Sequence, residues 1–238
     1  MGGVCPFFGQ SNSSRGIGRM RALIITTLAT LSALVLRVDA TLLHVAAEQN
    51  DITLVKKLID EGHSPDHVHN ETGLSALSAA AIHGSSEAIE ALIAAGADVH
   101  AVDEQRMTVL HDAAYYNRAS AIKMLLAHGA KVDAVDLSGS TPLHRAAFHG
   151  GTDAIKALVA GGAAVDAARG DDGHTPVHLA AQNGFEAAIH ALVDAGADLE
   201  KKTAKGLHAA EVAAFAGEQA ALNVINEHRI NIRAKMEL

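Results

Sequence analysis

Apolar and polar residues recur along most of the chain with a period of 33 or 34 residues. Each period holds two short apolar stretches, and the second is usually followed by Gly. Such repetition predicts a tandem array of identical structural units, each a pair of short helices. The first stretches read TLLHVAAEQN from Thr41, SALSAAAIHG from Ser75, TVLHDAAYYN from Thr108, TPLHRAAFHG from Thr141, TPVHLAAQNG from Thr175 and HAAEVAAFAG from His208.

Residue types at the ends of these stretches favour helices on physical grounds. Thr141 can cap a helix through its hydroxyl, and Pro142 suits the first helical position, where its missing N–H costs nothing. A Gly recurs where each second helix must end, since Gly tolerates a left-handed cap. Asn117 replaces the Gly that ends the first helix of most other units. Because one unit cannot bury its own apolar face, stacking of units must supply the stability.

The pattern resembles the ankyrin repeat, whose signature is a TPLH-type helix start, an AAxxG helix end and a GADV-type exit. Six matches in register make this signal specific. The resemblance implies an all-α solenoid of about six helix–turn–helix units with short β-hairpin connections. The repeat domain would span residues 41–238, with units near 41–74, 75–107, 108–140, 141–174, 175–207 and 208–238.

Residues 1–40 follow a different pattern. Fifteen uncharged, mostly apolar residues, Ala22 to Leu36, follow a basic flank, and no acidic residue precedes Asp39. The run is shorter than the roughly 17–25 residues of a spanning helix, and it ends in VDA, a small-residue cleavage pattern. We expect a secretory signal peptide cleaved after Ala40, for which Met20 would be a conventional start. Retention of the run as a membrane anchor is the alternative.

Composition and net charge limit the classes of partner that the chain is expected to bind. Apolar residues make up 49% of the chain and aromatic residues only 3%, so the core must be built from Ala, Leu, Ile and Val. The net charge is −8, and it becomes −11 after cleavage, with 15 basic against 26 acidic residues. This charge argues against nucleic acid and favours a neutral or basic protein partner. The single Cys5 excludes an internal disulfide and a cysteine zinc site.

The resemblance also indicates where a partner would bind. In ankyrin repeats, the residues between the Ala pair and the following Gly or Asn face a concave groove. Here that alignment gives the candidate partner-binding residues Ile82, Tyr115, Tyr116, Phe148 and His149, to which the hairpin tips add Glu104 and Arg106. Exposed tyrosines are typical interface anchors. Alternatively, Ile82 and Phe148 pack between helices, and we expect inward packing for Phe215 of the last unit.

The 15 histidines raise the question of a metal site. The ankyrin resemblance implies a structural role for the TPLH histidines, which bond backbone groups around the helix start. Those histidines are His44, His111, His144 and His178. Weak Zn²⁺ or Cu²⁺ capture by His63, His67 and His69 is the alternative to a solvated hairpin. We expect no metal and no cofactor.

Two short motifs lie on expected hairpins. Asn70 begins the sequon NET, so it would carry a glycan in a eukaryotic secretory pathway. Arg169-Gly170-Asp171 resembles the adhesion tripeptide read by integrins, although Gly-Asp is also ordinary turn chemistry.

The sequence contains no phosphate-binding Gly-rich loop, no HExxH and no nucleophile elbow, so we expect no enzymatic activity. The prediction is a secreted protein–protein interaction module that binds through its concave groove and hairpin tips. A periplasmic or extracellular structural or chaperone-like helper and a membrane-anchored ankyrin adaptor are the alternatives.

Overall fold

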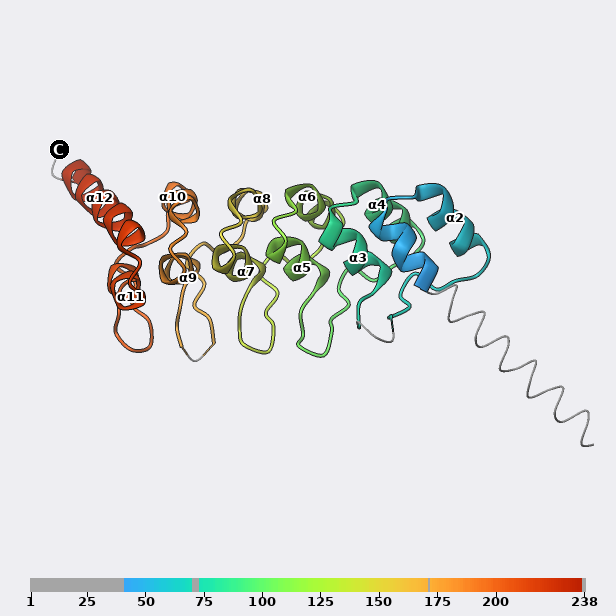
Figure 1. Ribbon diagram of the computed structural model, residues 1–238, viewed down its shortest axis with the longest axis horizontal. Helices are drawn as coiled ribbons and strands as arrows, with labels where there is room; N and C mark the ends of the chain where they lie inside the picture. Colours follow the sequence, from blue (N-terminus) through green and yellow to red (C-terminus); the bar gives the residue numbers. More distant parts are fainter. Residues whose placement is uncertain (1–40, 70–72, 171, 237–238) are drawn as a thin grey trace, which may run out of the picture.

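A computed structural model of the chain describes residues 41–69, 73–170 and 172–236. The predicted all-α repeat solenoid is confirmed: short helices stack in pairs along one axis (Figure 1). Residues 41–48 form the first described helix. The others are α2 (Ile52–Asp60), α3 (Ala76–His83), α4 (Ser86–Ala94), α5 (Val109–Tyr115), α6 (Ala119–Ala127), α7 (Pro142–Phe148), α8 (Thr152–Ala160), α9 (Pro176–Gln182), α10 (Glu186–Asp194), α11 (Ala209–Ala216) and α12 (Gln219–Met236).

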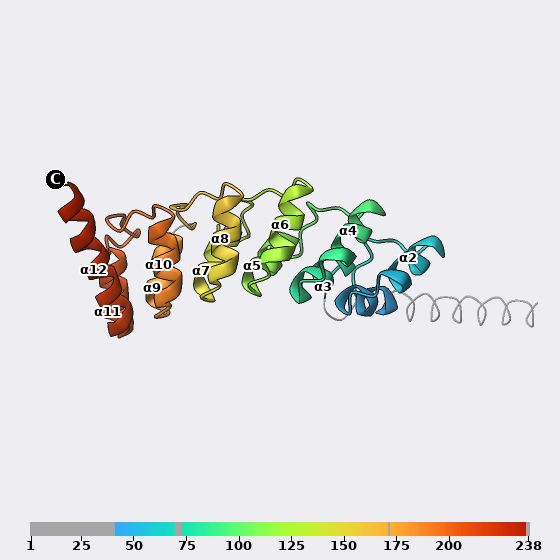
Figure 2. The same cartoon turned by 90° about the horizontal axis from the view of Figure 1, so that it is seen from above.

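The helices form two rows. The first helices of successive units, α3, α5, α7, α9 and α11, contact one another in order. The second helices, α4, α6, α8, α10 and α12, form the other row, as Figures 1 and 2 show. Each unit therefore touches mainly the unit before it and the unit after it, which is the organisation of a solenoid.

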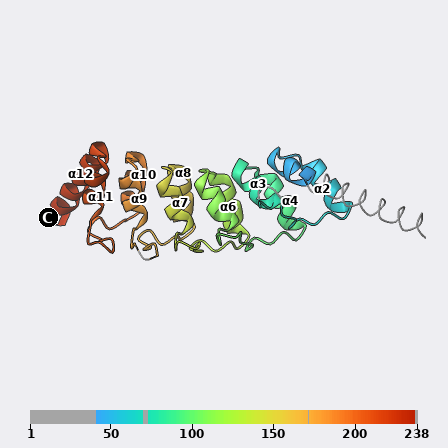
Figure 3. The same cartoon turned by 60° about the horizontal axis from the view of Figure 1, so that its bottom comes forward.

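The segments that connect the units project from one edge of the solenoid (Figures 1 and 3). Isolated antiparallel bridges close three of these connections: Val68 with Ser75, Val102 with Thr108, and Arg169 with His174. Within the described ranges no bridge extends into a longer strand, so the hairpins position turns without building a sheet.

The core follows from the small residues of the first helices and the branched residues of the second. Ala113 and Ala114 of α5 are fully buried, which lets neighbouring first helices approach closely. Ile122 and Leu125 of α6 are also fully buried. Burial of such a side chain contributes roughly 1.5–3 kcal/mol. The buried residues form one cluster that runs through all units, so stability depends on stacking.

Buried histidines tie each helix start to the next hairpin. The backbone N–H of Thr141 donates to Nδ1 of His144 at 3.1 Å, and Nε2 of that ring donates to the carbonyl of His174 at 3.0 Å. His111 and His178 repeat the arrangement. The structural role of the TPLH histidines is thus confirmed for these three, and His44 likewise bonds the Leu74 carbonyl.

The environment keeps these rings neutral. Burial lowers the pKa of His144 to about 4, although the His174 carbonyl opposes the shift. Burial also lowers the pKa of His111 and of His178. A neutral ring can accept at Nδ1 and donate at Nε2 at the same time, which is what each site requires.

Candidate functional site

Four aromatic side chains from two successive units meet at the ends of α5 and α7. The ring centroid of Tyr115 lies 4.8 Å from that of Tyr116 and 3.8 Å from that of His149. Phe148 contacts His149 edge-on at 5.0 Å. We call Tyr115, Tyr116, Phe148 and His149 the aromatic patch. The sequence predicted each of these residues separately, and the structure shows that they are in contact.

The aromatic patch is accessible to solvent and uncharged. Tyr115, Tyr116 and Phe148 are exposed by 40%, 45% and 39%, so a substantial part of each residue is open to a partner. Burial, and then the nearby Arg145, lowers the pKa of His149. The imidazole is therefore neutral near pH 7 and adds to the aromatic surface. Contiguous exposed rings of this kind are typical of interaction sites.

Charged groups lie on α5, on α7 and on the hairpin that precedes α7. Arg145 of α7 forms an ion pair with the buried Asp136, with Nη2 and Oδ2 2.5 Å apart. Burial would raise the pKa of Asp136, but hydrogen bonds from Ser138 and Ser140 and the pairing with Arg145 lower it to about 2. Asp112 of α5 behaves differently: burial raises its pKa to about 6, despite a hydrogen bond with Ser78.

Ile82 lies at the equivalent place in the preceding unit, near the end of α3. Its side chain is half-buried, and its backbone carbonyl accepts a hydrogen bond from Nε of Arg118 at 2.7 Å. The neighbouring His83 is exposed and lies 3.3 Å from a carboxylate oxygen of Glu48. Ile82 therefore continues the row of candidate residues but makes no ring contact with the aromatic patch.

The hairpin candidates form a separate surface. Glu104 and Arg106 are exposed in the connection between α4 and α5, and Arg106 adopts a left-handed conformation with φ of 59°. They precede the start of α5, whereas Tyr115 ends it. The seven residues of α5 span about 10 Å, so the structure does not bring the hairpin residues to the aromatic patch.

The structure corrects the expectation for Phe215 and adds a residue that sequence reasoning missed. Phe215 does not pack inward; it is 79% exposed, and in the part of the chain that the structure describes no first helix follows α11 to cover it. Arg118, just before α6, was not a candidate. Its signal in the sequence was a long basic residue where the other units have Asp, Ser, Gly, Phe or Glu.

The remaining sequence candidates are only partly described. His67 and His69 pack edge-on against His44, with ring centroids 6.4 and 5.5 Å away. In the portion of the chain that the structure describes, no group of three His, Cys, Asp or Glu side chains is arranged to hold a metal ion. No helix there is long and apolar enough to cross a membrane.

The glycosylation sequon, the adhesion tripeptide and the predicted signal peptide lie partly or wholly outside the residues that the structure describes. Asn70 and the signal segment 1–40 lie outside the described residues, as does Asp171 of the adhesion tripeptide. Arg169 is described, and its guanidinium forms an ion pair with Asp172. The guanidinium of Arg169, the charged group of the Arg-Gly-Asp tripeptide that the structure describes, is therefore already paired within the protein.

Comparison with known proteins gives a family match. A model of ankyrin repeats, comprising three copies, matches residues 43–136 and 130–203, which together exceed half of the chain. No curated protein matches the chain.

Proposed function

Because the chain belongs to the ankyrin repeat family, we propose that it is a binding module whose aromatic patch docks a protein partner. Ankyrin repeats are generally protein–protein interaction modules and are typically not enzymes. The proposal assigns the central contact to the third and fourth units and assigns no catalysis to this chain.

The observation that carries the proposal is the contact between exposed rings of two units. Tyr115 and Tyr116 supply large apolar surfaces with polar hydroxyls, and His149 buttresses Tyr115 at 3.8 Å. Such rings are partly ordered before binding, so less conformational entropy is lost when a partner covers them. Aromatic anchors of this type dominate the binding energy of many interfaces.

The net charge of the chain bears on the overall charge of its partner. The described surface belongs to a chain with a net charge of −8, so long-range electrostatics favour a partner that is neutral or basic overall. Ile82 would lie at one margin of the contact. Glu104 and Arg106 would contribute only to a partner large enough to reach from the patch to the hairpin edge.

The test uses the full chain to capture partners, followed by titration calorimetry of the purified complex. Replacing Tyr115 and Tyr116 together with Ala should weaken binding by at least thirtyfold, since one buried interface aromatic is worth on the order of 2 kcal/mol. The melting temperature should stay nearly constant, because Ala113 and Ala114 still pack the helices. Phe215→Ala is the matched control, at the same repeat position outside the patch, and it should leave affinity unchanged.

Two results would contradict this assignment. A double variant that melts many degrees lower would show that the tyrosines stabilise the fold and are not a binding surface. A double variant that melts normally and binds as well as the native chain would move the interface elsewhere, with Glu104 and Arg106 as the next positions to vary.

We also propose that the chain is secreted. The support is the apolar run Ala22 to Leu36 behind a basic flank, followed by VDA. Intact mass of protein recovered outside the cytoplasm should correspond to a chain that begins at Thr41. A product that keeps the run and fractionates with membranes would support an anchored adaptor instead. In a eukaryotic host, Asn70 should carry a glycan that endoglycosidase removes.

A further inference from the structure

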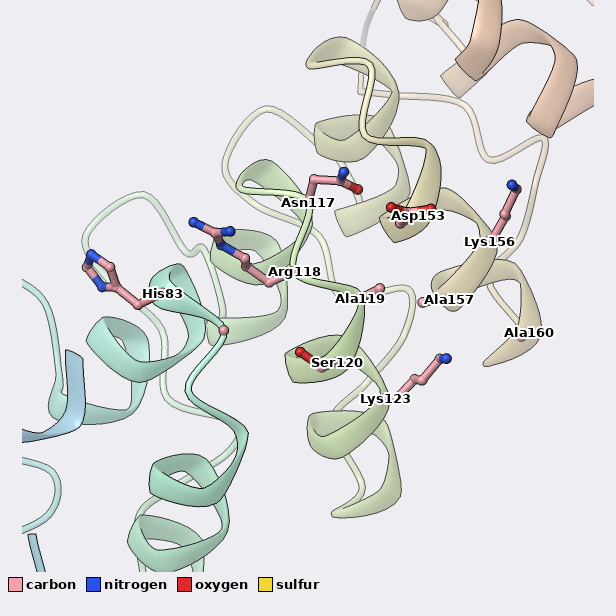
Figure 4. A pocket seen from close by; sticks show the side chains of 11 residues that line it. His83, Asn117, Arg118, Ala119, Ser120, Lys123, Asp153, Lys156, Ala157 and Ala160 are labelled. Carbon is pink, nitrogen blue, oxygen red and sulfur yellow. The ribbon is translucent and has the colours of Figure 1, made fainter. Parts of the chain in front are cut away.

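A hollow of about 610 Å³ lies where α3, α6 and α8 come together (Figure 4). His83 and Gly84 at the end of α3 form one side of it. Asn117 and Arg118, which precede α6, and Ala119, Ser120 and Lys123 of α6 line its middle, and residues of α8 line the other side. None of the four residues of the aromatic patch lines this hollow.

The hollow is basic in a chain that is acidic overall. Arg118, Lys123 and Lys156 line it, against one acidic residue, Asp153. Arg118 donates from Nε to the Ile82 carbonyl, and its side chain points toward His83 (Figure 4). Among the described residues, neither lysine forms an ion pair, so their charges are not neutralised by the protein.

The two lysines are related by the repeat. Lys123 is the fifth residue of α6 and Lys156 is the fifth residue of α8, so stacking places one ammonium group on each successive unit. The equivalent residues are Lys56 in α2, Glu90 in α4, His190 in α10 and Asn223 in α12. Glu90 separates Lys56 from the other two lysines, so only the third and fourth units place lysines at this position side by side, and Arg118 adds a third cation on the side of α3.

The arrangement suits an extended ligand better than a single ion. Figure 4 shows that Arg118, Lys123 and Lys156 spread across the hollow and do not converge on one point. A lone phosphate could reach only part of this set. A chain that carries several carboxylates could pair with each cation in turn, as charge complementarity requires.

We propose that this basic hollow binds an acidic polypeptide segment, whose side-chain carboxylates pair with Arg118, Lys123 and Lys156. Asp153 opposes the binding, because its carboxylate lies among the three cations. The site is separate from the aromatic patch and does not depend on it. An acidic segment here is compatible with a partner that is neutral or basic as a whole.

The test measures fluorescence polarisation of a labelled hexaglutamate peptide with the full chain at low ionic strength. Lys123→Glu combined with Lys156→Glu should weaken binding at least tenfold, and added salt should weaken it progressively. Lys202→Glu with Lys205→Glu is the matched control: both residues are exposed on another hairpin, and the total charge changes equally. Asp153→Asn should tighten binding by about twofold to fivefold.

Several outcomes would overturn the proposal. One is equal loss of binding in the two lysine pairs, which would show an effect of total charge alone. Another is weaker hexaglutamate binding by Asp153→Asn, or preferential binding of hexalysine, since both would indicate a basic ligand. Displacement of the peptide by millimolar inorganic phosphate would reassign the hollow to small anions. The Tyr115→Ala, Tyr116→Ala variant should bind hexaglutamate normally, which separates this site from the aromatic patch.

Discussion

The side-chain oxygen of Asn117 accepts a hydrogen bond from the backbone N–H of Ala154, 2.8 Å away in the next unit. Ala154 is the third residue of α8, so Asn117 caps a helix that belongs to its neighbour. Asn50 does the same for α4, accepting from the N–H of Ala88 at 3.0 Å. Both asparagines adopt a left-handed backbone, with φ of 55° and 57°.

We predict that Asn117→Ala lowers the free energy of unfolding by about 1–2 kcal/mol. The variant loses the cap of α8 and places an alanine in a left-handed conformation. Urea denaturation measures the change. Asn117→Asp keeps an acceptor oxygen at the helix start and should remain close to the native stability. If the Asp variant is as unstable as the Ala variant, the hydrogen bond to Ala154 contributes nothing.

At Gly84 and Gly150, which hold this position in two other units, a large side chain from the next unit lies close by. A Cβ on Gly150 would lie 2.7 Å from Cδ1 of Phe185, and a Cβ on Gly84 would lie 3.3 Å from Cδ of Arg118. Both glycines have positive φ, of 69° and 77°. Replacing either one with Ala therefore introduces a similar backbone strain.

We predict that Gly150→Ala destabilises the fold by about 1 kcal/mol more than Gly84→Ala. The ring of Phe185 is rigid, whereas the Arg118 side chain can shift, so only the first contact is overpacked. The excess should disappear when Gly150→Ala is combined with Phe185→Ala. An unchanged excess in that double variant would place the strain elsewhere.

Because the buried histidines are held neutral in the fold, we predict that the free energy of unfolding decreases in mild acid. The pKa of His144 is about 4 in the fold, against about 6.5 when unfolded, so the unfolded chain binds more protons between these values. Stability is therefore full above pH 6.5 and falls as the pH drops toward 4, by about 3 kcal/mol from this ring alone. Urea midpoints from pH 7.5 to pH 4 test this, and constant midpoints would contradict the neutral-ring assignment.

Asp112 acts in the opposite direction. Burial raises its pKa to about 6, so the folded chain binds the proton more tightly than the unfolded chain does. Its ionised form therefore reduces stability near neutral pH, and this penalty fades as the pH falls below 6. Asp112→Asn should stabilise the fold at pH 7.5 and have less effect at pH 4.5. A benefit that does not depend on pH would rule out titration of Asp112 as the cause.

The sequence by itself determined the helix pairs, the residues at which most first helices begin, and the repeat family. A Thr-Pro pair such as Thr141 and Pro142 favours a helix start from the sequence alone, because capping depends only on residues within one turn. The role of His144 was also readable, since the same histidine recurs in the same local setting in several units. Local and periodic signals of this kind need no knowledge of the stack.

Only the tertiary structure decided which side chains of different units meet. The contact of Tyr115 with His149, the cap from Asn117 to Ala154 and the row of Arg118, Lys123 and Lys156 all cross unit boundaries. The exposure of Phe215 likewise depends on the absence of a covering first helix beyond α11 among the described residues. The repeat period fixes how often a position recurs, but the offset and rotation between stacked units fix its neighbours, and these arise from packing of the whole array.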